Sequence, residues 1–216
     1  MRITGAHQNP YLASKLVYLY FACGSIVYVP TAFDEASRRS MFMWNSLLRA
    51  YVKNGFCETK AMEIYNQMKL SGTELNNFTF SIMLKACGIL MDLQQGMEIH
   101  GQVIKTGYEL DVFVGGALVH MYCRCRFVED ANQVFKEMRH RDVVTWTAMI
   151  AGLVHNGFHG EALECFRQLH VEEHKPNLET MALVLLACGI LAALRKGKEI
   201  HGYIVRGIPT LLCELL

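Results

Sequence analysis

The residues that could carry out chemistry are a few histidines, cysteines and glutamates. His170 and Glu172 form a His-x-Glu pair, which in zinc deaminases binds the metal and transfers a proton. That chemistry also needs a Cys-x-x-Cys pair, and the chain has no Pro-Cys-x-x-Cys segment. Cys123 and Cys125 lie two residues apart, so a helix would point their sulfurs roughly 200° apart and away from a common ion. We therefore expect no metal site and no cofactor.

No other catalytic arrangement stands out in the sequence. It has no phosphate-binding Gly-rich loop after a strand pattern and no nucleophile elbow. His100 and His201 occupy the same position of two internal repeats, which favours a structural role for both. We expect that the chain is not an enzyme.

The composition allows a buried core but does not indicate a partner. The chain is 52% hydrophobic and carries a net charge of +1, so it has no overall basic field to attract a phosphate backbone. Binding to nucleic acid would depend on local patches and on the bases. Cys23 recurs as Cys125 and Cys87 recurs as Cys188, which predicts small buried side chains in a reducing compartment.

No secretory or membrane segment is recognisable in the sequence. Residues 1–10 lack an apolar stretch, and the longest apolar run, 181–194, is short for a membrane span. Residues 4–5 match residues 106–107. We therefore expect the chain to begin inside a repeat and to lack the region where an organelle address would lie.

The elements that must position these residues are repeats. Trp44 and Trp146 lie 102 residues apart, and after Phe56 the offset between matching residues becomes 101, which indicates one inserted residue. In the window 86–101, 11 of 16 residues are identical to their partners at 187–202, where chance would give about one. The chain is therefore an array.

Each repeat contains two helices. Residues 43–52 have apolar side chains at helical spacing and stop at Asn54-Gly55, a helix-terminating signal. A second apolar helix face follows at 61–68. One such hairpin cannot bury both of its faces, so it stacks on the next hairpin. Strand signals are weak, and we predict an all-α fold, a right-handed superhelical α-solenoid of helix-turn-helix repeats.

The lengths and motifs of the units are specific. Equivalent turns give successive lengths of 31, 36, 35, 31 and 35 residues, whereas tetratricopeptide arrays hold close to 34. The motifs are residues 143–152 with 156–157, residues 118–123 with 131–135, and a Gly-x-Glu-Ile-His-Gly element at 96–101 and 197–202. With the alternating lengths they resemble the plant pentatricopeptide repeat (PPR) family, in its PLS subclass of mixed long and short repeats.

The resemblance divides one continuous solenoid domain into units. They are the tail of an incomplete repeat at 1–9, a short repeat at 10–40, a P-type repeat at 41–76, a long repeat at 77–111, a short repeat at 112–142, a P-type repeat at 143–177, and an incomplete long repeat with a divergent C-terminus at 178–216.

The resemblance also implies a function. Members of the family bind single-stranded RNA in mitochondria or chloroplasts, in RNA editing, processing or stability, with RNA-editing proteins as further partners. In the family the fifth and last residues of a unit choose the base, and the second residue wedges between bases. The base-choosing pairs here would be Asn45 with Asn76 for a pyrimidine, Thr147 with Asn177 for adenine, and Ser81 with Asp111, which would follow the code poorly. The wedging residues would be Tyr11, Phe42, Phe78, Phe113 and Val144.

Structural roles remain open for these side chains. The fifth residues could be exposed residues of a first helical turn, and the last residues stand where a helix N-cap is expected. Phe42 and Phe78 could belong to the core.

Several residues depart from the family pattern. Pro30 falls inside an expected helix, which it should break or shift. Arg126 replaces the turn glycine found at Gly24, and residues 115–116, both glycine, leave unit 112–142 without a base-reading side chain. Two alternative functions therefore stay open: a helical scaffold that binds protein, and a truncated array with little residual function.

Overall fold

Short turns join a succession of helices along the chain. The computed structural model describes residues 10–34 and 39–206, and no strand occurs among them, so the predicted all-α solenoid is confirmed. The helices are α1 (Pro10–Ala22), α2 (Val29–Asp34), α3 (Met41–Lys53), α4 (Met62–Leu70), α5 (Asn77–Leu90), α6 (Leu93–Thr106), α7 (Val112–Arg124), α8 (Val128–Glu137), α9 (Val143–His155), α10 (His159–Val171), α11 (Leu178–Ile190) and α12 (Leu194–Arg206).

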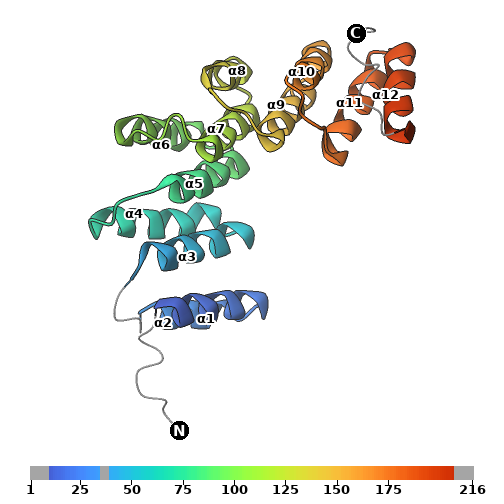
Figure 1. Cartoon of the computed structure of the whole chain (residues 1–216). Helices are drawn as coiled ribbons and strands as arrows, with labels where there is room; N and C mark the ends of the chain where they lie inside the picture. The colour runs from blue at the N-terminus through green and yellow to red at the C-terminus, as the bar shows by residue number, and fades with distance from the viewer. Residues whose placement is uncertain (1–9, 35–38, 207–216) are drawn as a thin grey trace.

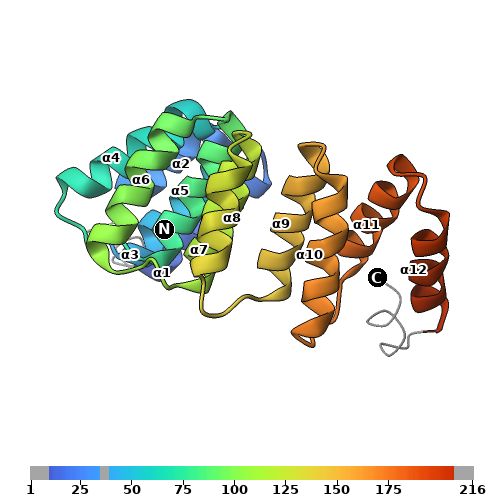
Figure 2. The same ribbon diagram turned by 90° about the horizontal axis from the view of Figure 1, so that it is seen from above.

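The helices form two layers. Each odd-numbered helix packs on the next odd-numbered helix, from α1 on α3 to α9 on α11, and each even-numbered helix packs against the odd-numbered helix before it. The stack rises from α1 to α7 and then turns toward α12 (Figure 1). Seen from above, α1 to α8 overlap in one group, while α9 to α12 extend to the side (Figure 2). The odd-numbered helices are therefore the layer that continues from unit to unit.

Each predicted unit begins with a helix of this continuous layer. Residues 10, 41, 77, 112, 143 and 178, where the units were expected to begin, are the first residues of the odd-numbered helices. Five of these helices have a side-chain N-cap on the residue before, which satisfies an otherwise unpaired backbone N–H: Ser40, Asn76, Asp111, Asp142 and Asn177. The sorting of units into short, P-type and long classes stays a prediction, and the segments 1–9 and 207–216 lie outside the described residues.

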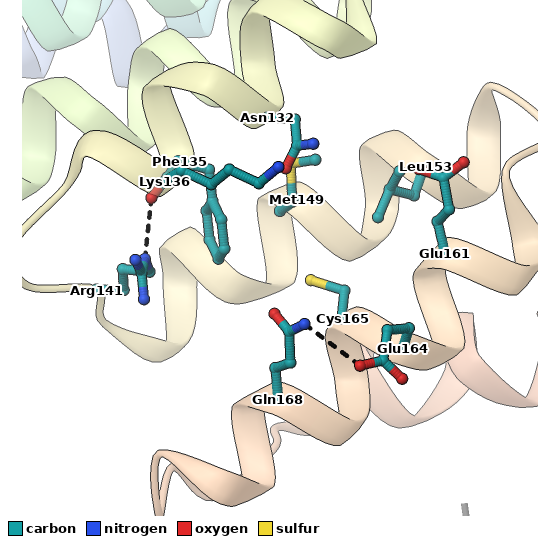
Figure 3. Close-up of a pocket in the computed structure, with 10 residues that line it drawn as sticks. All are labelled: Asn132, Phe135, Lys136, Arg141, Met149, Leu153, Glu161, Glu164, Cys165 and Gln168. Atoms are coloured by element: carbon teal, nitrogen blue, oxygen red, sulfur yellow. Dashed lines mark hydrogen bonds between the residues drawn. The ribbon is translucent and has the colours of Figure 1, made fainter.

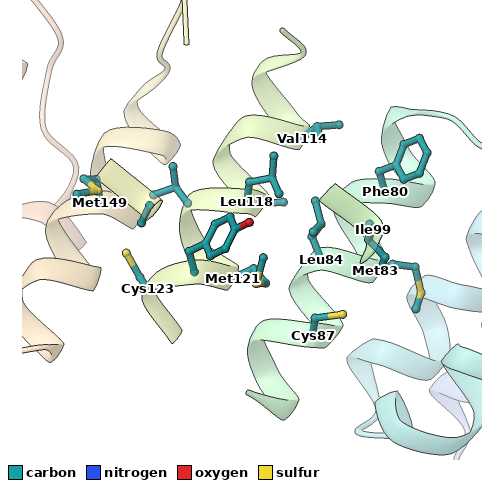
Figure 4. Close-up of a cluster of buried hydrophobic side chains, with 14 of the residues drawn as sticks. Phe80, Met83, Leu84, Cys87, Ile99, Val114, Leu118, Met121, Cys123 and Met149 are labelled. Carbon is teal, nitrogen blue, oxygen red and sulfur yellow. The ribbon is translucent and has the colours of Figure 1, made fainter. Parts of the chain in front are cut away.

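The hydrophobic core is continuous between the layers. Trp44 and Trp146 are 2% and 0% exposed. Each packs edge-on against a phenylalanine of the preceding unit, Phe33 at 4.5 Å and Phe135 at 4.7 Å between ring centroids. Side chains of α5, α6, α7 and α9 continue this core in the middle of the array (Figure 4). The repeated tryptophan therefore marks a repeated packing contact.

The cysteines follow the predicted burial only in part. Cys87 and Cys188 are buried as expected, and burial raises the pKa of the Cys87 thiol to about 12. Cys23 is exposed and Cys125 is half-buried, so the prediction of a buried position is wrong for this second pair. Both lie at the turn after an odd-numbered helix, where the chain leaves the core. A residue type that recurs in an array is therefore not always a core residue.

The inserted residue indicated by the change of offset lies in a π turn. The N–H of Ala61 donates to the carbonyl of Phe56, five residues back, at 3.1 Å within the π turn Cys57–Ala61. In the second copy the N–H of Ala162 donates to the carbonyl of Phe158, four residues back, at 3.0 Å. A π turn holds one more residue than an α turn. Both alanines are fully buried, so the extra residue leaves the packing position unchanged.

Pro30 shifts a helix start, as predicted. A 3₁₀ turn at Ile26–Tyr28 precedes α2, which begins at Val29, so the proline stands in the first turn, where no intrahelical N–H bond is lost. The equivalent helix α8 begins at Val128, which matches Ile26 in the first copy. Within residues 10–34 and 39–206, no helix combines the length and apolar character needed to cross a membrane.

Candidate functional site

The pair Asn45 and Asn76 meets at the junction of α3 and α5. The side-chain amide of Asn45 donates to Oδ1 of Asn76 at 3.1 Å, and the hydroxyl of Thr79 donates to Oδ1 of Asn45 at 2.7 Å. Oδ1 of Asn76 also caps α5 by accepting from the N–H of Thr79 at 3.0 Å. Capping therefore uses the oxygen of Asn76. The described residues offer no partner to its amide nitrogen, which stays available to a ligand.

The pair Thr147 and Asn177 meets in the same way at the junction of α9 and α11. The amide of Asn177 donates to Oγ1 of Thr147 at 3.3 Å, and Oδ1 of Asn177 caps α11 by accepting from the N–H of Thr180 at 2.8 Å. Thr147 also donates to the carbonyl of Val143 at 2.6 Å and is 4% exposed. The possibility that the fifth residues are simply exposed is therefore wrong, since Asn45 is half-buried and Thr147 is buried.

The third pair, Ser81 and Asp111, is not brought together. Ser81 is buried and donates to the carbonyl of Asn77 at 2.8 Å. One oxygen of Asp111 caps α7, and the other accepts a 2.8 Å hydrogen bond from the side chain of Asn77. Asn77 is a residue that the sequence analysis missed. Its signal was present, because the other odd-numbered helices begin with an apolar residue or proline.

The five expected wedging residues form one row of exposed side chains. Each is the second residue of its helix, and each is more than half exposed: Tyr11 59%, Phe42 58%, Phe78 58%, Phe113 61% and Val144 68%. The possibility that Phe42 and Phe78 belong to the core is therefore wrong. The rings of Phe78 and Phe113 face each other, with centroids 6.3 Å apart and planes 27° apart. We call these residues the exposed row.

Basic side chains lie on the same side of the helices as the exposed row. Helices α1, α3, α5, α7 and α9 contain no Asp or Glu, and their Lys and Arg residues follow a row residue by 4, 7 or 11 positions, which places them on its face. These are Lys15, Arg49, Lys53, Lys85 and Arg124, all exposed. We call this surface the row face. The net charge of +1 thus conceals a local basic patch.

Within helices α1 to α10, the acidic residues lie on the outer layer. Helices α2 to α10 of the even-numbered series carry Asp34, Glu63, Glu98, Glu129, Asp130, Glu137, Glu161 and Glu164. From α1 to α10 the inner layer is therefore basic and the outer layer acidic on balance, which directs a polyanion to the row face of these units; at the end of the array α11 carries Glu179 and α12 is basic.

A hollow of about 430 Å³ opens on the row face over α9. The hollow exists because three of the α9 residues that line it have small side chains or none: Ala148, Ala151 and Gly152. Thr147, Asn177 and Arg124 are among the residues that line it. The hollow therefore places one of the two polar pairs beside a basic and an acidic side chain, Arg124 and Glu179.

A second hollow, of about 230 Å³, lies between α8 and α10 and contains none of the expected site residues (Figure 3). Its walls include Leu153 and Cys165, where the first copy has the larger residues Tyr51 and Ile64. We attribute this hollow to the smaller side chains of the second copy.

The residues considered for zinc are dispersed. In the described part of the chain, no three or more His, Cys, Asp or Glu residues are grouped to hold a metal ion. His170 packs between the rings of Phe166 and Tyr203, at 4.7 and 5.3 Å, and burial lowers its pKa. Cys123 is buried, and burial raises the pKa of its thiol to about 12.

Comparison with solved structures gives the same fold. The chain superposes on the pentatricopeptide repeat protein PPR10 in complex with an 18-nt psaJ RNA element with a TM-score of 0.72, at 21% identity, over 89% of this chain and 29% of that chain. It also superposes on the PPR domain of Arabidopsis thaliana protein-only RNase P 1 in complex with tRNA, with a TM-score of 0.61 at 15% identity, over 82% of this chain and 97% of that chain.

Sequence comparisons identify the family. The chain is 40% identical over 215 residues to the chloroplastic pentatricopeptide repeat-containing protein CRR2 of Arabidopsis thaliana, covering 96% of this chain and 33% of that protein. It is 36% identical to a mitochondrial pentatricopeptide repeat-containing protein of the same plant, covering 88% of this chain and 28% of that protein. The chain thus spans about a third of the length of such relatives. The PPR repeat family model matches residues 39–88, and the PPR repeat model matches residues 116–143 and 144–173, together half of the chain. With its stacked helix hairpins, the chain belongs to the pentatricopeptide repeat family.

Proposed function

We propose that the chain binds single-stranded RNA along the row face, as a recognition module without catalysis of its own. The observation that carries the proposal is the contact of Asn45 with Asn76 and of Thr147 with Asn177, although 31 and 30 residues separate them. Each pair stands at the start of a helix that also carries a residue of the exposed row. A polar pair and an exposed side chain that recur along an array fit the reading of one unstacked base per unit.

Three kinds of contact divide the recognition. The Lys and Arg side chains of the row face meet phosphates and position the strand without reading it. The exposed row packs against base faces, a contact worth about 1–3 kcal/mol per base and tolerant of sequence. The polar pairs meet the base edges, so they alone distinguish one base from another.

The free hydrogen-bonding groups can meet a base edge. Asn45 keeps acceptor capacity on its oxygen and Asn76 keeps its amide donors, an arrangement that can bind any of the four bases, so the pyrimidine preference of this pair rests on the family resemblance. In unit 143–177 the second N–H of the Asn177 amide is a donor, which N1 of adenine accepts and the N1–H of guanine does not. The proposed RNA reads pyrimidine, any, any, adenine from 5′ to 3′, in the parallel orientation that the family resemblance implies.

The comparisons support the biological setting. The two solved relatives are complexes with an RNA element and with tRNA, and sequence relatives carry chloroplastic or mitochondrial names. We therefore place the chain in organelle RNA metabolism, in editing, processing or stability. We also assign it to the PLS subclass, in which RNA-editing proteins are further partners.

Fluorescence anisotropy with short RNAs tests the proposal. We expect an RNA with C, U, U and A at the four positions to bind about tenfold tighter than one with C, U, U and G. Asn177→Asp keeps a capping oxygen but replaces the amide donor by an acceptor, so it should reverse this preference. Equal affinity for both RNAs rejects the assignment of Thr147 and Asn177. No binding to any single-stranded RNA rejects the RNA-binding function itself.

A further inference from the structure

Unit 77–111 has an unusual first residue. Among the described units, the first helix begins with Pro10, Met41, Val112, Val143 or Leu178, and only this one begins with a polar side chain, Asn77. An apolar residue at this position cannot hydrogen-bond to its neighbours, whereas an asparagine amide has two donors. The unit therefore has a hydrogen-bonding group that the other described units lack.

The side-chain amide of Asn77 forms a hydrogen bond to the last residue of its own unit, Asp111. Nδ2 of Asn77 donates to Oδ2 of Asp111 at 2.8 Å, 34 residues along the chain. Oδ1 of Asp111 accepts from the N–H groups of Phe113 and Val114 at 2.9 and 3.0 Å. Both carboxylate oxygens are thus engaged. Asp142, at the same place of the next unit, also caps a helix through Oδ1, and its Oδ2 has no partner within residues 10–34 and 39–206.

The fifth residue of the unit, Ser81, has no free hydrogen-bond donor for a base. Ser81 is 8% exposed, and its single hydroxyl proton is donated to the carbonyl of Asn77 at 2.8 Å. In units 41–76 and 143–177 the fifth and last residues contact each other and leave an amide N–H over. In unit 77–111 the side chain of Asn77 takes the place of the fifth residue, so Oδ1 of Asp111 is held by the cap of α7 and one lone pair of Oδ2 is held by Asn77. The carboxylate therefore cannot accept a pair of adjacent donors from a base edge.

The same unit has an apolar place for a base. Phe78 and Phe113 are 58% and 61% exposed, and their ring centroids lie 6.3 Å apart with planes inclined by 27°. A base stacked between two rings needs roughly 6.8 Å, twice the 3.4 Å rise of stacked bases. A widening of about half an ångström, with a small rotation toward parallel planes, therefore admits any of the four bases.

We propose that unit 77–111 holds its base by stacking alone, and that Asn77 is the positioning residue that keeps Asp111 from selecting a base. The proposal rests on the RNA-binding function proposed above and names the specificity of one unit within it. By this proposal, the unit does not select a base because Asn77 hydrogen-bonds to Asp111, and not because it lacks a side chain that could select one.

The chemistry predicts what release of Asp111 would select. A carboxylate only accepts hydrogen bonds, and it accepts best from two donors side by side. The Watson–Crick edge of guanine presents two donors side by side, N1–H and the exocyclic NH₂. Adenine and cytosine present only the exocyclic NH₂ on this edge, and uracil presents only N3–H. Oδ1 of Asp111 stays engaged in the cap of α7, so the released Oδ2 is the atom that meets these donors. Its two lone pairs can accept from both, and Asp111 freed of Asn77 should therefore prefer guanine.

The decisive variant is Asn77→Val, because valine begins both α7 and α9. Four RNAs that differ only at the base of unit 77–111 are titrated against the wild-type chain and the variant by anisotropy. We expect the wild-type chain to bind all four within about twofold, and the variant to bind the guanine RNA at least fivefold tighter than the others. Thermal unfolding confirms that the variant is folded, and Asn77→Ala gives a second folded variant with the same expectation.

Two controls separate selection from stacking. Asn77→Val combined with Asp111→Asn keeps a capping oxygen but removes the carboxylate, so the guanine preference should disappear. Phe113→Ala should weaken all four RNAs alike, by about fivefold or more.

The outcomes distinguish this proposal from the function on which it rests. Wild-type discrimination at this base, or a variant that binds all four RNAs equally, overturns the role of Asn77 while RNA binding stands. A wild-type chain that binds none of the four RNAs overturns the RNA-binding function and this proposal together.

Discussion

Gly152 of α9 and Cys123 of α7 are packed so closely that a Cβ atom on Gly152 would overlap the Cys123 sulfur. Both residues are buried, and Cys123 belongs to the core between the odd-numbered helices. A methyl group here must displace the sulfur or separate the two helices, and the hollow of about 430 Å³ beside both residues is the space into which the sulfur could turn.

We therefore expect Gly152→Ala to lower the free energy of unfolding by about 2 kcal/mol, measured by chemical denaturation. Gly160→Ala is the matched control, since Gly160 lies in α10 with no atom near the position of an added Cβ. Alanine favours helix, so this control should keep or raise stability, by up to about 1 kcal/mol. Equal stability of the two variants would show that α7 and α9 separate at little cost.

Lys85 tests the electrostatic role of the row face. It is exposed on α5, seven residues after Phe78. We expect Lys85→Ala to weaken binding of all RNA sequences alike and to reduce the slope of log affinity against log salt by about 0.7, the value for one phosphate contact on a single strand. Lys105→Ala, on the outer helix α6, should change neither quantity. A base-dependent loss with Lys85→Ala would contradict a phosphate contact.

A substitution of Arg126 tests how much a left-handed backbone conformation at this turn lowers the stability of the fold. Its φ is 68°, as at Gly24, and Gly157 of unit 143–177 has φ 88°. This left-handed region disfavours a residue with a Cβ by about 1–2 kcal/mol, partly offset by the greater entropy of glycine in the unfolded chain. We expect Arg126→Gly to stabilise the chain by about 0.5–1 kcal/mol in thermal unfolding, and Gly157→Ala to destabilise it. A destabilising Arg126→Gly would indicate a stabilising contact of the arginine.

Three half-buried histidines make stability depend on pH. Burial lowers the pKa of His100, His120 and His170 below the ordinary 6.5. The unfolded chain then binds more protons than the folded chain as the pH falls through 6.5, so the stabilisation is complete above that value and is lost below it. Denaturation at about pH 7.5 and about pH 5.5 should show the loss.

The matched variant for this pH effect is His170→Phe, which keeps an aromatic ring between Phe166 and Tyr203. It should lose less stability than the wild-type chain over the same interval, because one proton-binding group is gone. An unchanged loss would exclude His170 as a contributor.

The sequence predicts the framework of this fold well because packing repeats. Trp44 and Trp146 recur since both fill the same contact with a phenylalanine, and the starts of α3, α5, α7, α9 and α11 follow from their capping residues. The pattern for Cys23 and Cys125 was misread, because a turn position can recur as faithfully as a core position.

The candidate site was only partly predictable. The pairs Asn45 with Asn76 and Thr147 with Asn177 follow from the unit register, but a sequence does not reveal which amide atom the helix cap uses. The basic row face was hidden in the net charge until the helices were sorted into two layers. Asn77 was overlooked because its effect acts through Asp111, 34 residues away.

The π turn at Cys57–Ala61 has a consequence for how such arrays can change length. It lies between α3 and α4, at the turn that leads into the outer layer, and absorbs one added residue before the chain reaches the next cap. The polar pair of that unit spans 31 residues and that of the second copy spans 30, yet both close at 3.1 and 3.3 Å. An added residue at this turn therefore changes only the turn itself and leaves the packing on either side of it unchanged. The two copies differ by one residue at this turn, and the polar pair closes in both.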